Sequence, residues 1–419
     1  MTLNRRKFLQ STAGAAAVAA AQRSLAQAPA RPTFEQLDRA AAAPVLQVPE
    51  LKLPVKIASM ELLRNGRTFL VRVRSSDGAE GLAVANGSRL RETYPIFLNR
   101  VAPFFIGKDA RLLDEIVGPQ GVYRHASNYK LQGIALWACV AAAEFAVLDM
   151  LGHLSGRSIG KLVGKVVRRE VAVYRASGNR GNRPEEEIEY LQKLVAQTGA
   201  GAVKFRVGGR MSNNADSRPG RSEALIPLVR KSFGEKMTIY ADANSSYDAS
   251  HAIRLGRMMQ EHDYGFFEEP CRFDHLEETK RVADALQIPV AGGEQEFSMR
   301  RFRWMIHHRA VDVVQPDLHY FGGYIRCMRV ARMAATAGMP CTLHMSGSGL
   351  GYLDVLHFAS CIANPGAHQE FKGESRLPIS CETSSLRCKR GIVRVPSSPG
   401  FGVSIDPEFV RRAQKVTTL

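Results

Sequence analysis

The sequence predicts a (β/α)7β barrel, a closed parallel sheet of eight strands, preceded by a smaller α+β unit. Acidic residues end short apolar runs at Asp242, Glu268 and Glu294, at a constant interval of 26 residues. Similar runs continue the register upstream and downstream, and segments with helical periodicity lie between them. One βα unit of such a barrel takes about 30 residues, so the interval fits consecutive units.

Eight strands are predicted, and each except the last is expected to be followed by a helix. The first strand is EVAVYRAS, and the later ones end at Lys204–Arg206, Asp242, Glu268, Glu294, Asp317, His344 and Glu370. An apolar period of 3.6 residues predicts helices at 185–198, 222–233, 250–262, 276–286, 324–337 and 353–363. The polar stretch GGRMSNNADSRPG after the second strand predicts a loop insertion at the face where the strands end.

A separate α+β unit is predicted over residues 45–165, before the barrel at 166–385. Strands are expected at 55–60 and 68–73, around the hairpin turn Arg64-Asn-Gly-Arg67, with a third at 81–85. Helices are expected at 94–105, 110–117 and 131–154. The last segment, 386–419, is expected to return to this unit.

The first 26 residues predict a twin-arginine signal peptide. Arg5 and Arg6 precede Lys7-Phe8-Leu9 and a modestly apolar Ala/Gly-rich stretch, and small residues around Ala26 suit cleavage. The protein is therefore expected to be periplasmic or secreted, exported already folded. No run of 18 apolar residues is present, so we expect no membrane-spanning helix.

The net charge narrows the classes of partner, and the cysteine spacing indicates how the thiols are used. Cleavage after residue 26 would remove four basic residues and lower the formal net charge from +17 to +13. The basic residues are scattered and no nucleic-acid-binding motif accompanies them, so a basic surface that attracts an anionic substrate is the simpler interpretation. The seven cysteines form no C-x-x-C pair and are expected to be core thiols, although Cys381 and Cys388 could pair after export.

The three acidic residues at the strand ends predict a metal site. The carboxyl ends of barrel strands meet at one face, so Asp242, Glu268 and Glu294 are expected to converge there. Three oxygen ligands without Cys or His suit a hard cation such as Mg²⁺. Asn244 shares the strand face of Asp242 and is expected either to support the site or to bind substrate. Glu269 points the other way along its strand.

A histidine is the predicted acid/base group. His344 titrates near working pH, and Asp317 at the end of the preceding strand could orient its imidazole and raise its pKa. His319 is a weaker competitor. A substrate carboxylate becomes an enediolate when the carbon next to it loses a proton. Glu370, on the last strand, could donate a hydrogen bond to that enediolate if the neighbouring carboxylates keep Glu370 protonated. Lys204 and Arg206 share a strand face opposite His344 and are expected to act in catalysis and in binding substrate.

The ordered set of motifs resembles the enolase superfamily, in its mandelate racemase and acid-sugar dehydratase branch. The matching motifs, over about residues 50–400, are Lys204-x-Arg206, Asp242-Ala-Asn244, Glu268-Glu-Pro270, Gly292-Gly-Glu294, Gln315-Pro-Asp317 with Gly322-Gly323, His344 and Glu370. The resemblance implies a modified TIM barrel with an α+β capping domain. Its covering loops are expected at 59–66 and 86–91.

Arg206 departs from the resemblance, because many relatives carry a second lysine there that acts as a base. Arginine is effectively always protonated and is a poor base. Racemisation needs a proton donor or acceptor on each face of the carbon next to the substrate carboxylate. Dehydration needs one base for the proton on that carbon and one acid for the departing hydroxyl, and a single histidine can serve as both. Arg206 therefore favours a dehydratase, although Lys204 could itself be a second base.

The predicted function is that of a Mg²⁺-dependent dehydratase of an aldonic or aldaric acid, which gives a 2-keto-3-deoxy product. The alternatives are a racemase or epimerase on the same scaffold, or an exported carboxylate-binding protein without catalytic activity. The expected partner is a small-molecule carboxylate, and the protein is expected to be a homo-oligomer. The identity of the acid depends on the covering loops.

Overall fold

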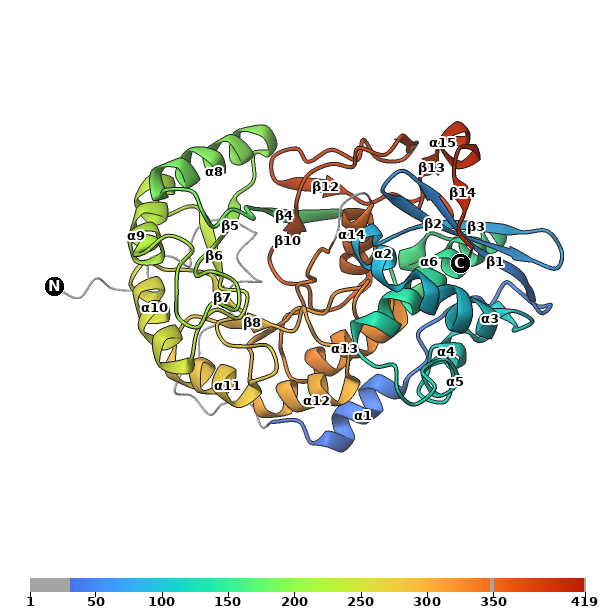
Figure 1. Ribbon diagram of the computed structural model, residues 1–419, viewed down its shortest axis with the longest axis horizontal. Coiled ribbons are helices and arrows are strands. Elements are labelled where there is room, and N and C mark those ends of the chain that lie inside the picture. Colours follow the sequence, from blue (N-terminus) through green and yellow to red (C-terminus); the bar gives the residue numbers. More distant parts are fainter. Residues whose placement is uncertain (1–30, 347–349, 418–419) are drawn as a thin grey trace.

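The computed structural model describes residues 31–346 and 350–417, so the predicted signal peptide lies outside the described residues. Two units lie side by side in Figure 1: a ring of parallel strands surrounded by helices, and a smaller unit that contains an antiparallel sheet. The predicted fold class, a (β/α)7β barrel with an N-terminal α+β capping domain, is confirmed. The limits of the two domains stay predictions.

The barrel strands are short and parallel, and they follow the chain order around the ring. They are β4 (Glu170–Ala176), β5 (Ala202–Arg206), β6 (Thr238–Asp242), β7 (Phe266–Glu268), β8 (Val290–Gly292), β9 (Val313–Val314) and β10 (Gln369–Phe371). Their registers pair Arg206 with Asp242 and Asp242 with Glu268. The functional residues at their ends are therefore placed on one level by the backbone hydrogen bonds of the sheet.

The seventh strand, predicted to end at His344, is the exception. Residues 341–344 make only isolated parallel bridges, Val314 with Cys341 and Asp317 with His344 on one side, and Cys341 with Pro365 on the other. Pro316 and Pro340 lie beside these bridges, and proline has no N–H to donate to a ladder. The ring therefore closes here through fewer backbone hydrogen bonds than elsewhere.

Seven helices cover the outside of the barrel within the described chain (Figure 1). Six were predicted and agree with the structure within two residues: α8 (Pro184–Thr198), α9 (Arg221–Phe233), α10 (Ala249–Glu261), α11 (Leu276–Ala285), α13 (Tyr324–Thr336) and α14 (Gly351–Cys361). The helix α12 (Met299–His308) was expected after the strand that ends at Glu294, but no range was predicted for it. Its buried residues Phe302, Met305 and Ile306 do have helical spacing, but the arginines before and between them obscure the pattern.

The capping domain contains a four-stranded antiparallel sheet in the order β14-β1-β2-β3. Its strands are β1 (Ile57–Asn65), β2 (Thr68–Ser75), β3 (Glu80–Ala85) and β14 (Gln414–Lys415). The chain after residue 386 contacts both units, because β12 (Ile392–Arg394) pairs with β4 and β14 pairs with β1. Between them lie β13 (Ser404–Ile405), which pairs with β11 (Ile379–Ser380), and α15 (Pro407–Arg411).

The two predicted covering loops are not loops over most of their length. Residues 59–65 belong to strand β1, which pairs with β2 on one side and β14 on the other. Residues 87–91 form the start of helix α2 (Gly87–Ile96), because the side chain of Asn86 accepts a hydrogen bond from the backbone N–H of Arg89 and caps the helix. Asn86 nevertheless reaches the barrel, as described below.

Further helices complete the capping domain and join it to the barrel. They are α1 (Phe34–Ala42), the π-helical turn η4 (Phe97–Val101), α3 (Ala102–Phe105), the 3-10 turn η5 (Ala110–Leu112), α4 (Leu113–Ile116), α5 (Val122–Ala126), α6 (Ile134–Ser155) and α7 (Ile159–Val163). Glu144 of α6 accepts a hydrogen bond from the N–H of Ile325 at the start of α13. Burial raises the pKa of Glu144 to about 8, so the contact is a hydrogen bond that satisfies a free N–H group at the helix start, and it links the two units.

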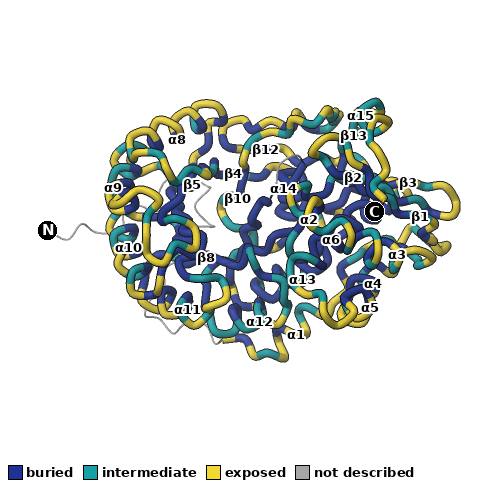
Figure 2. The backbone as a smooth tube through the Cα atoms, in the orientation of Figure 1, coloured by how far each residue is buried: buried dark blue, intermediate teal, exposed yellow. Residues whose placement is uncertain are grey.

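The buried residues form the interior of each of the two units. The barrel strands and α6 are buried, whereas the outer turns of α8 to α11 are exposed (Figure 2). The helix α6 is long and apolar enough to cross a membrane by length and composition, but 89% of its most apolar window is buried inside the protein. All seven cysteines are free, including Cys381 and Cys388, and all but Cys381 are buried.

Candidate active site

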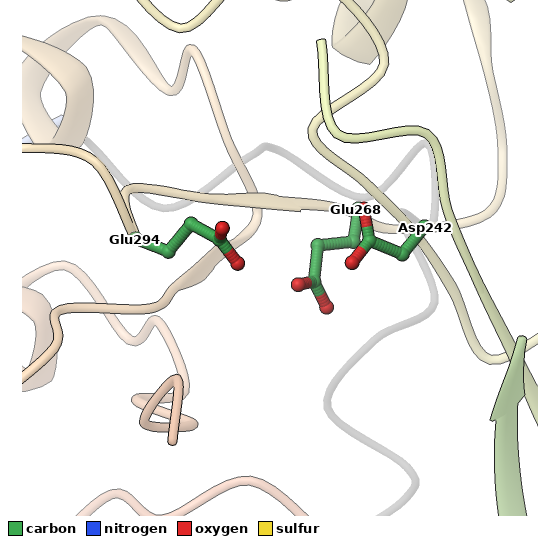
Figure 3. A group of neighbouring side chains, drawn as sticks. All are labelled: Asp242, Glu268 and Glu294. Carbon is green, nitrogen blue, oxygen red and sulfur yellow. The ribbon is translucent and has the colours of Figure 1, made fainter. Parts of the chain in front are cut away.

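The three predicted metal ligands lie together at the carboxyl ends of β6, β7 and β8. Asp242, Glu268 and Glu294 are buried, and each offers one carboxylate oxygen to a group of three that all lie within 4.8 Å of one another. Figure 3 shows the three carboxylates pointing into the same space, with Glu294 facing the other two. Asp242 and Glu268 are partners in the sheet register, so their proximity follows from the barrel itself.

Two cations from β5 lie beside this acidic cluster. The ammonium of Lys204 lies 2.7 and 2.8 Å from the two carboxylate oxygens of Glu268, and 3.8 Å from Asp242. The guanidinium of Arg206 pairs with Asp242. Burial lowers the pKa of Lys204, but the carboxylates of Glu268 and Glu370 raise it by more, so the net shift is upward and Lys204 is a cation here.

Side-chain amides hold each of the three carboxylates in place. Asn244 donates to Asp242 from its backbone N–H at 2.7 Å and from its amide at 3.2 Å. Gln315 donates to Glu268 at 2.9 Å, and Gln295 to Glu294 at 2.9 Å. Of the two roles predicted for Asn244, the structure therefore shows support of a ligand.

A second cluster, the acid/base dyad, lies next to the acidic cluster. The Nδ1 atom of His344 lies 2.7 Å from Asp317, and its Nε2 atom lies 3.3 Å from Glu294. Asp317 also accepts hydrogen bonds from the backbone N–H groups of His319 and Tyr320, at 2.8 and 2.9 Å. Burial lowers the pKa of His344, but Glu294 and Asp317 outweigh it and the net shift is upward. The bond to Asp317 places a proton on Nδ1 and directs Nε2 to the site.

Glu370 lies between the lysine and the histidine, in surroundings that favour an ionised carboxylate over the protonated form considered from the sequence. Its carboxylate accepts the N–H of Met345 at 2.7 Å and lies 3.2 Å from Lys204 and 3.7 Å from Lys372. Burial raises its pKa, but the two lysines lower it by more, so the net shift is well downward. An ionised Glu370 cannot donate a hydrogen bond, and it serves as a counter-ion that joins Lys204 to the dyad.

The competing histidine, His319, bonds a different carboxylate. Its Nε2 atom lies 3.1 Å from Asp354, whose carboxylate also accepts from the hydroxyl of Tyr324. The ring packs edge-on against Phe145 of α6. His319 therefore lies behind Asp317 and away from the metal ligands. Glu269 is buried and contacts Asn244 at 3.5 Å, as expected for a residue that supports the site from outside.

The residues of the acidic cluster fit Mg²⁺. All three donors are hard carboxylate oxygens, the class of ligand that Mg²⁺ prefers. Within the described chain, the buried Oε2 atom of Glu294 makes no hydrogen bond of good geometry, and the Nε2 atom of His344 lies 3.3 Å from it. Such a buried carboxylate oxygen is costly unless a cation or donor approaches it, and a divalent ion between the three groups would satisfy it.

Comparison with known proteins agrees with this arrangement. Residues 186–409 match the enolase C-terminal domain-like family, and residues 40–164 match the mandelate racemase / muconate lactonizing enzyme N-terminal domain. The chain belongs to the enolase superfamily. Within it, the N-terminal match places the chain in the mandelate racemase and muconate lactonizing enzyme-like branch, as the resemblance implied.

Two curated relatives in this superfamily are named dehydratases. Arabinonate dehydratase from Saccharolobus solfataricus is 26% identical over 80% of this chain and 87% of its own length. D-galactonate dehydratase from Ralstonia pickettii is 25% identical over 83% of this chain and 91% of its own length. Because both matches span nearly the full length of each protein, they support an enzyme, with a lyase activity favoured by the two names.

Two solved structures of the superfamily share the fold. A protein from Roseobacter denitrificans, provisionally named a racemase, is 34% identical with a TM-score of 0.80, over 86% of this chain and 99% of its own. A mandelate racemase/muconate lactonizing protein from Paracoccus denitrificans, solved with magnesium, is 26% identical with a TM-score of 0.77, over 87% and 99%. Racemases and dehydratases therefore both occur among the structures and sequences similar to this chain.

Sequence reasoning missed several residues of this superfamily site. Gln315 was recognised only as part of a motif, although it contacts Glu268. Lys372 lies two residues after Glu370, and that spacing on one strand face was a usable signal. Asn86 and Ser346 also reach the dyad, but nothing in the sequence connects them, because they are 260 residues apart.

Proposed function

We propose that the protein is a Mg²⁺-dependent dehydratase of an acid sugar, an aldonic or aldaric acid. The observation that carries this proposal is the asymmetry of the site. His344, held at Nδ1 by Asp317, offers its Nε2 atom for proton transfer, whereas Arg206, which pairs with Asp242 and is a poor base, stands at the motif position where the resemblance implies a second base. The dehydratases among the relatives support the same reaction class.

The first step is removal of the proton next to the substrate carboxylate. Asp242, Glu268 and Glu294 would hold Mg²⁺, which would supply positive charge beside that carboxylate and so make the adjacent C–H more acidic. The Nε2 atom of His344 accepts the proton, and Asp317 stabilises the imidazolium that results. The electron pair of the broken C–H bond passes into the carboxylate of the substrate.

The second step expels the β-hydroxyl group. His344 now carries a proton on Nε2 and returns it to the departing oxygen, so the C–O bond breaks and water leaves. This requires the proton and the hydroxyl to leave from the same side of the substrate. The resulting enol gains a proton at the third carbon and loses the proton of its hydroxyl group at the second carbon, and so becomes a 2-keto-3-deoxy acid. Lys204 and Arg206 stay protonated and hold the negative charge of the ligands and the substrate in place.

The test is to screen aldonic and aldaric acids with Mg²⁺ in deuterium oxide. A dehydratase gives a 2-keto-3-deoxy product. Exchange of the proton next to the carboxylate, without such a product, would indicate the racemase or epimerase alternative, in which Lys204 is the second base. Binding of an acid sugar with neither exchange nor product would indicate the carboxylate-binding protein and contradict the proposal.

We also propose that the protein is exported through the twin-arginine pathway, on the basis of Arg5 and Arg6 alone. Cell fractionation of the wild type and of an Arg5→Lys/Arg6→Lys double variant tests this proposal. Export of the wild type and retention of the double variant in the cytoplasm are expected. A wild-type protein that stays in the cytoplasm with residues 1–26 intact would contradict it.

A further inference from the structure

A chain of hydrogen bonds joins the capping domain to the acid/base dyad. Asn86 directly follows strand β3, and its side-chain amide donates to the hydroxyl of Ser346 at 3.1 Å. That hydroxyl donates to Asp317 at 3.0 Å, and Asp317 bonds His344 at 2.7 Å. Asn86 and Ser346 are both buried, so water does not compete for these hydrogen bonds.

The chemistry of the groups fixes the direction of each bond. The carbonyl oxygen of Asn86 already caps helix α2 by accepting from Arg89 N–H, so its amide is the part that faces Ser346. The NH2 group of an amide can only donate, so the Ser346 oxygen must accept from it. The Tyr320 hydroxyl also interacts with Ser346 and can act as a second donor, which leaves the single Ser346 proton for Asp317, an acceptor when ionised. A hydroxyl that could otherwise rotate is thereby held in one orientation.

This orientation matters for Asp317 and through it for His344. One oxygen of Asp317 receives three donors, from Ser346, His319 and Tyr320. Its other oxygen is left for Nδ1 of His344. Because the seventh strand is reduced to isolated bridges, side-chain bonds such as these carry more of the positioning here than they would on a regular strand.

We propose that Asn86 and Ser346 are positioning residues, through which the capping domain holds Asp317 and so orients His344. Asn86 acts through Ser346, and Ser346 acts through Asp317. The chain of hydrogen bonds that supports the dyad is therefore complete only when the capping domain is docked on the barrel. This inference rests on the proposed function where turnover is the readout, and a second readout below does not need it.

The kinetic test is a double-mutant cycle. Ser346→Ala removes the hydroxyl and is expected to lower kcat about tenfold, with little change in KM, as for other residues that support catalytic groups. Asn86→Ser keeps a good helix cap but is too short to reach Ser346, and it is expected to lower kcat about fivefold through loss of one hydrogen bond. Ser346→Thr, which keeps the hydroxyl, is expected to retain most of the activity.

The double variant decides the matter. If Asn86 acts through Ser346, Asn86→Ser/Ser346→Ala should be as slow as Ser346→Ala alone, because the amide has nothing left to orient. If the two residues act independently, their effects should multiply, to a loss of about fiftyfold, and the proposal is wrong. Thr33→Ser, a change of cap at the start of α1 far from the dyad, controls for the exchange of capping residues, and thermal melting confirms that each variant is folded.

The second readout is the nuclear magnetic resonance of His344 in protein labelled with ¹⁵N-histidine, at one Mg²⁺ concentration and without substrate. The His344→Asn variant assigns the signals. Ser346→Ala and the double variant are expected to shift them equally, and Asn86→Ser by a smaller amount. Signals of Ser346→Ala that stay at the wild-type positions would overturn the proposal. If no acid sugar is turned over, the proposed function fails, but this measurement still decides the positioning role.

Discussion

The two halves of the site are built in different ways. In the metal half, Asp242 and Glu268 end consecutive strands whose registers pair them directly, and Lys204 comes from the strand next to them. In the acid/base half, Asp317 and His344 share a single isolated bridge, and side-chain hydrogen bonds from Ser346 and the capping domain hold them. Backbone pairing therefore places two of the three predicted metal ligands, with support from amide side chains of the barrel, whereas side chains from both domains position the proton-transfer groups.

This difference implies that the two halves of the site depend on different parts of the structure. The metal half depends on the barrel alone, so it should be preformed and respond mainly to the charge of its ligands. The acid/base half depends on contacts between the two domains, so its geometry should respond to changes far from the substrate. The predictions below test whether changes in each half have separate consequences, first for the metal ligands and last for Arg206.

Loss of a metal ligand should have the largest effect. Asp242→Asn, Glu268→Gln and Glu294→Gln each remove one of three negative charges, and each is expected to lower turnover by more than about 10³-fold and to weaken Mg²⁺ binding. Calorimetric titration with Mg²⁺ measures binding separately from turnover. Removal of the metal with EDTA should abolish activity, and Mg²⁺ should restore it. Full activity in chelator would contradict the metal assignment.

The metal half was predictable from the sequence, because a regular interval along the chain becomes proximity when strands lie parallel and in register. The acid/base half was predictable only in part. Asp317 and His344 follow at intervals close to 26 residues, but the charge on Glu370 depends on Lys204 as well as on Lys372, and only the folded chain brings Lys204 beside it. The contact between Asn86 and Ser346 depends on docking of the two domains, which no local pattern encodes.

Loss of the catalytic histidine should come next. His344→Asn is expected to lower both proton exchange and dehydration by about 10² to 10⁴-fold, toward the upper end because one group serves in both steps. Asp317→Asn should be less severe, because the imidazole stays while its orienting charge is lost. Both variants should bind Mg²⁺ with nearly the affinity of the wild type. Proton exchange at the wild-type rate in His344→Asn would place the base near Lys204 and refute the one-base mechanism.

Two buried glutamines offer a matched comparison between the halves. Gln315 donates to the metal ligand Glu268, and Gln369 accepts from the N–H of Leu343, next to His344. Gln315→Met is expected to weaken Mg²⁺ binding by about 10 to 100-fold and to keep most of kcat at saturating Mg²⁺. Gln369→Met is expected to leave Mg²⁺ binding unchanged and to lower kcat about fivefold. The same pattern in both variants would show that the halves are not separate.

Exchange of one cation for another at position 206 should have a small effect on rate and the most informative effect on product. The guanidinium of Arg206 pairs with Asp242, and a lysine would keep the positive charge but lose the planar, multiply donating group. Arg206→Lys is therefore expected to retain dehydration within about tenfold of the wild type.

The informative product is the epimer of the substrate. A lysine can lose its proton and act as a base, whereas arginine cannot, so Arg206→Lys is expected to gain slow inversion at the carbon next to the carboxylate. Arg206→Gln, which has neither charge nor basicity, is the matched control and should show no inversion. Nuclear magnetic resonance of the recovered substrate measures both. Inversion by the wild type at a rate comparable to that of the lysine variant would mean that Lys204 already serves as a second base, and that the two faces of the site are less different than Arg206 suggests.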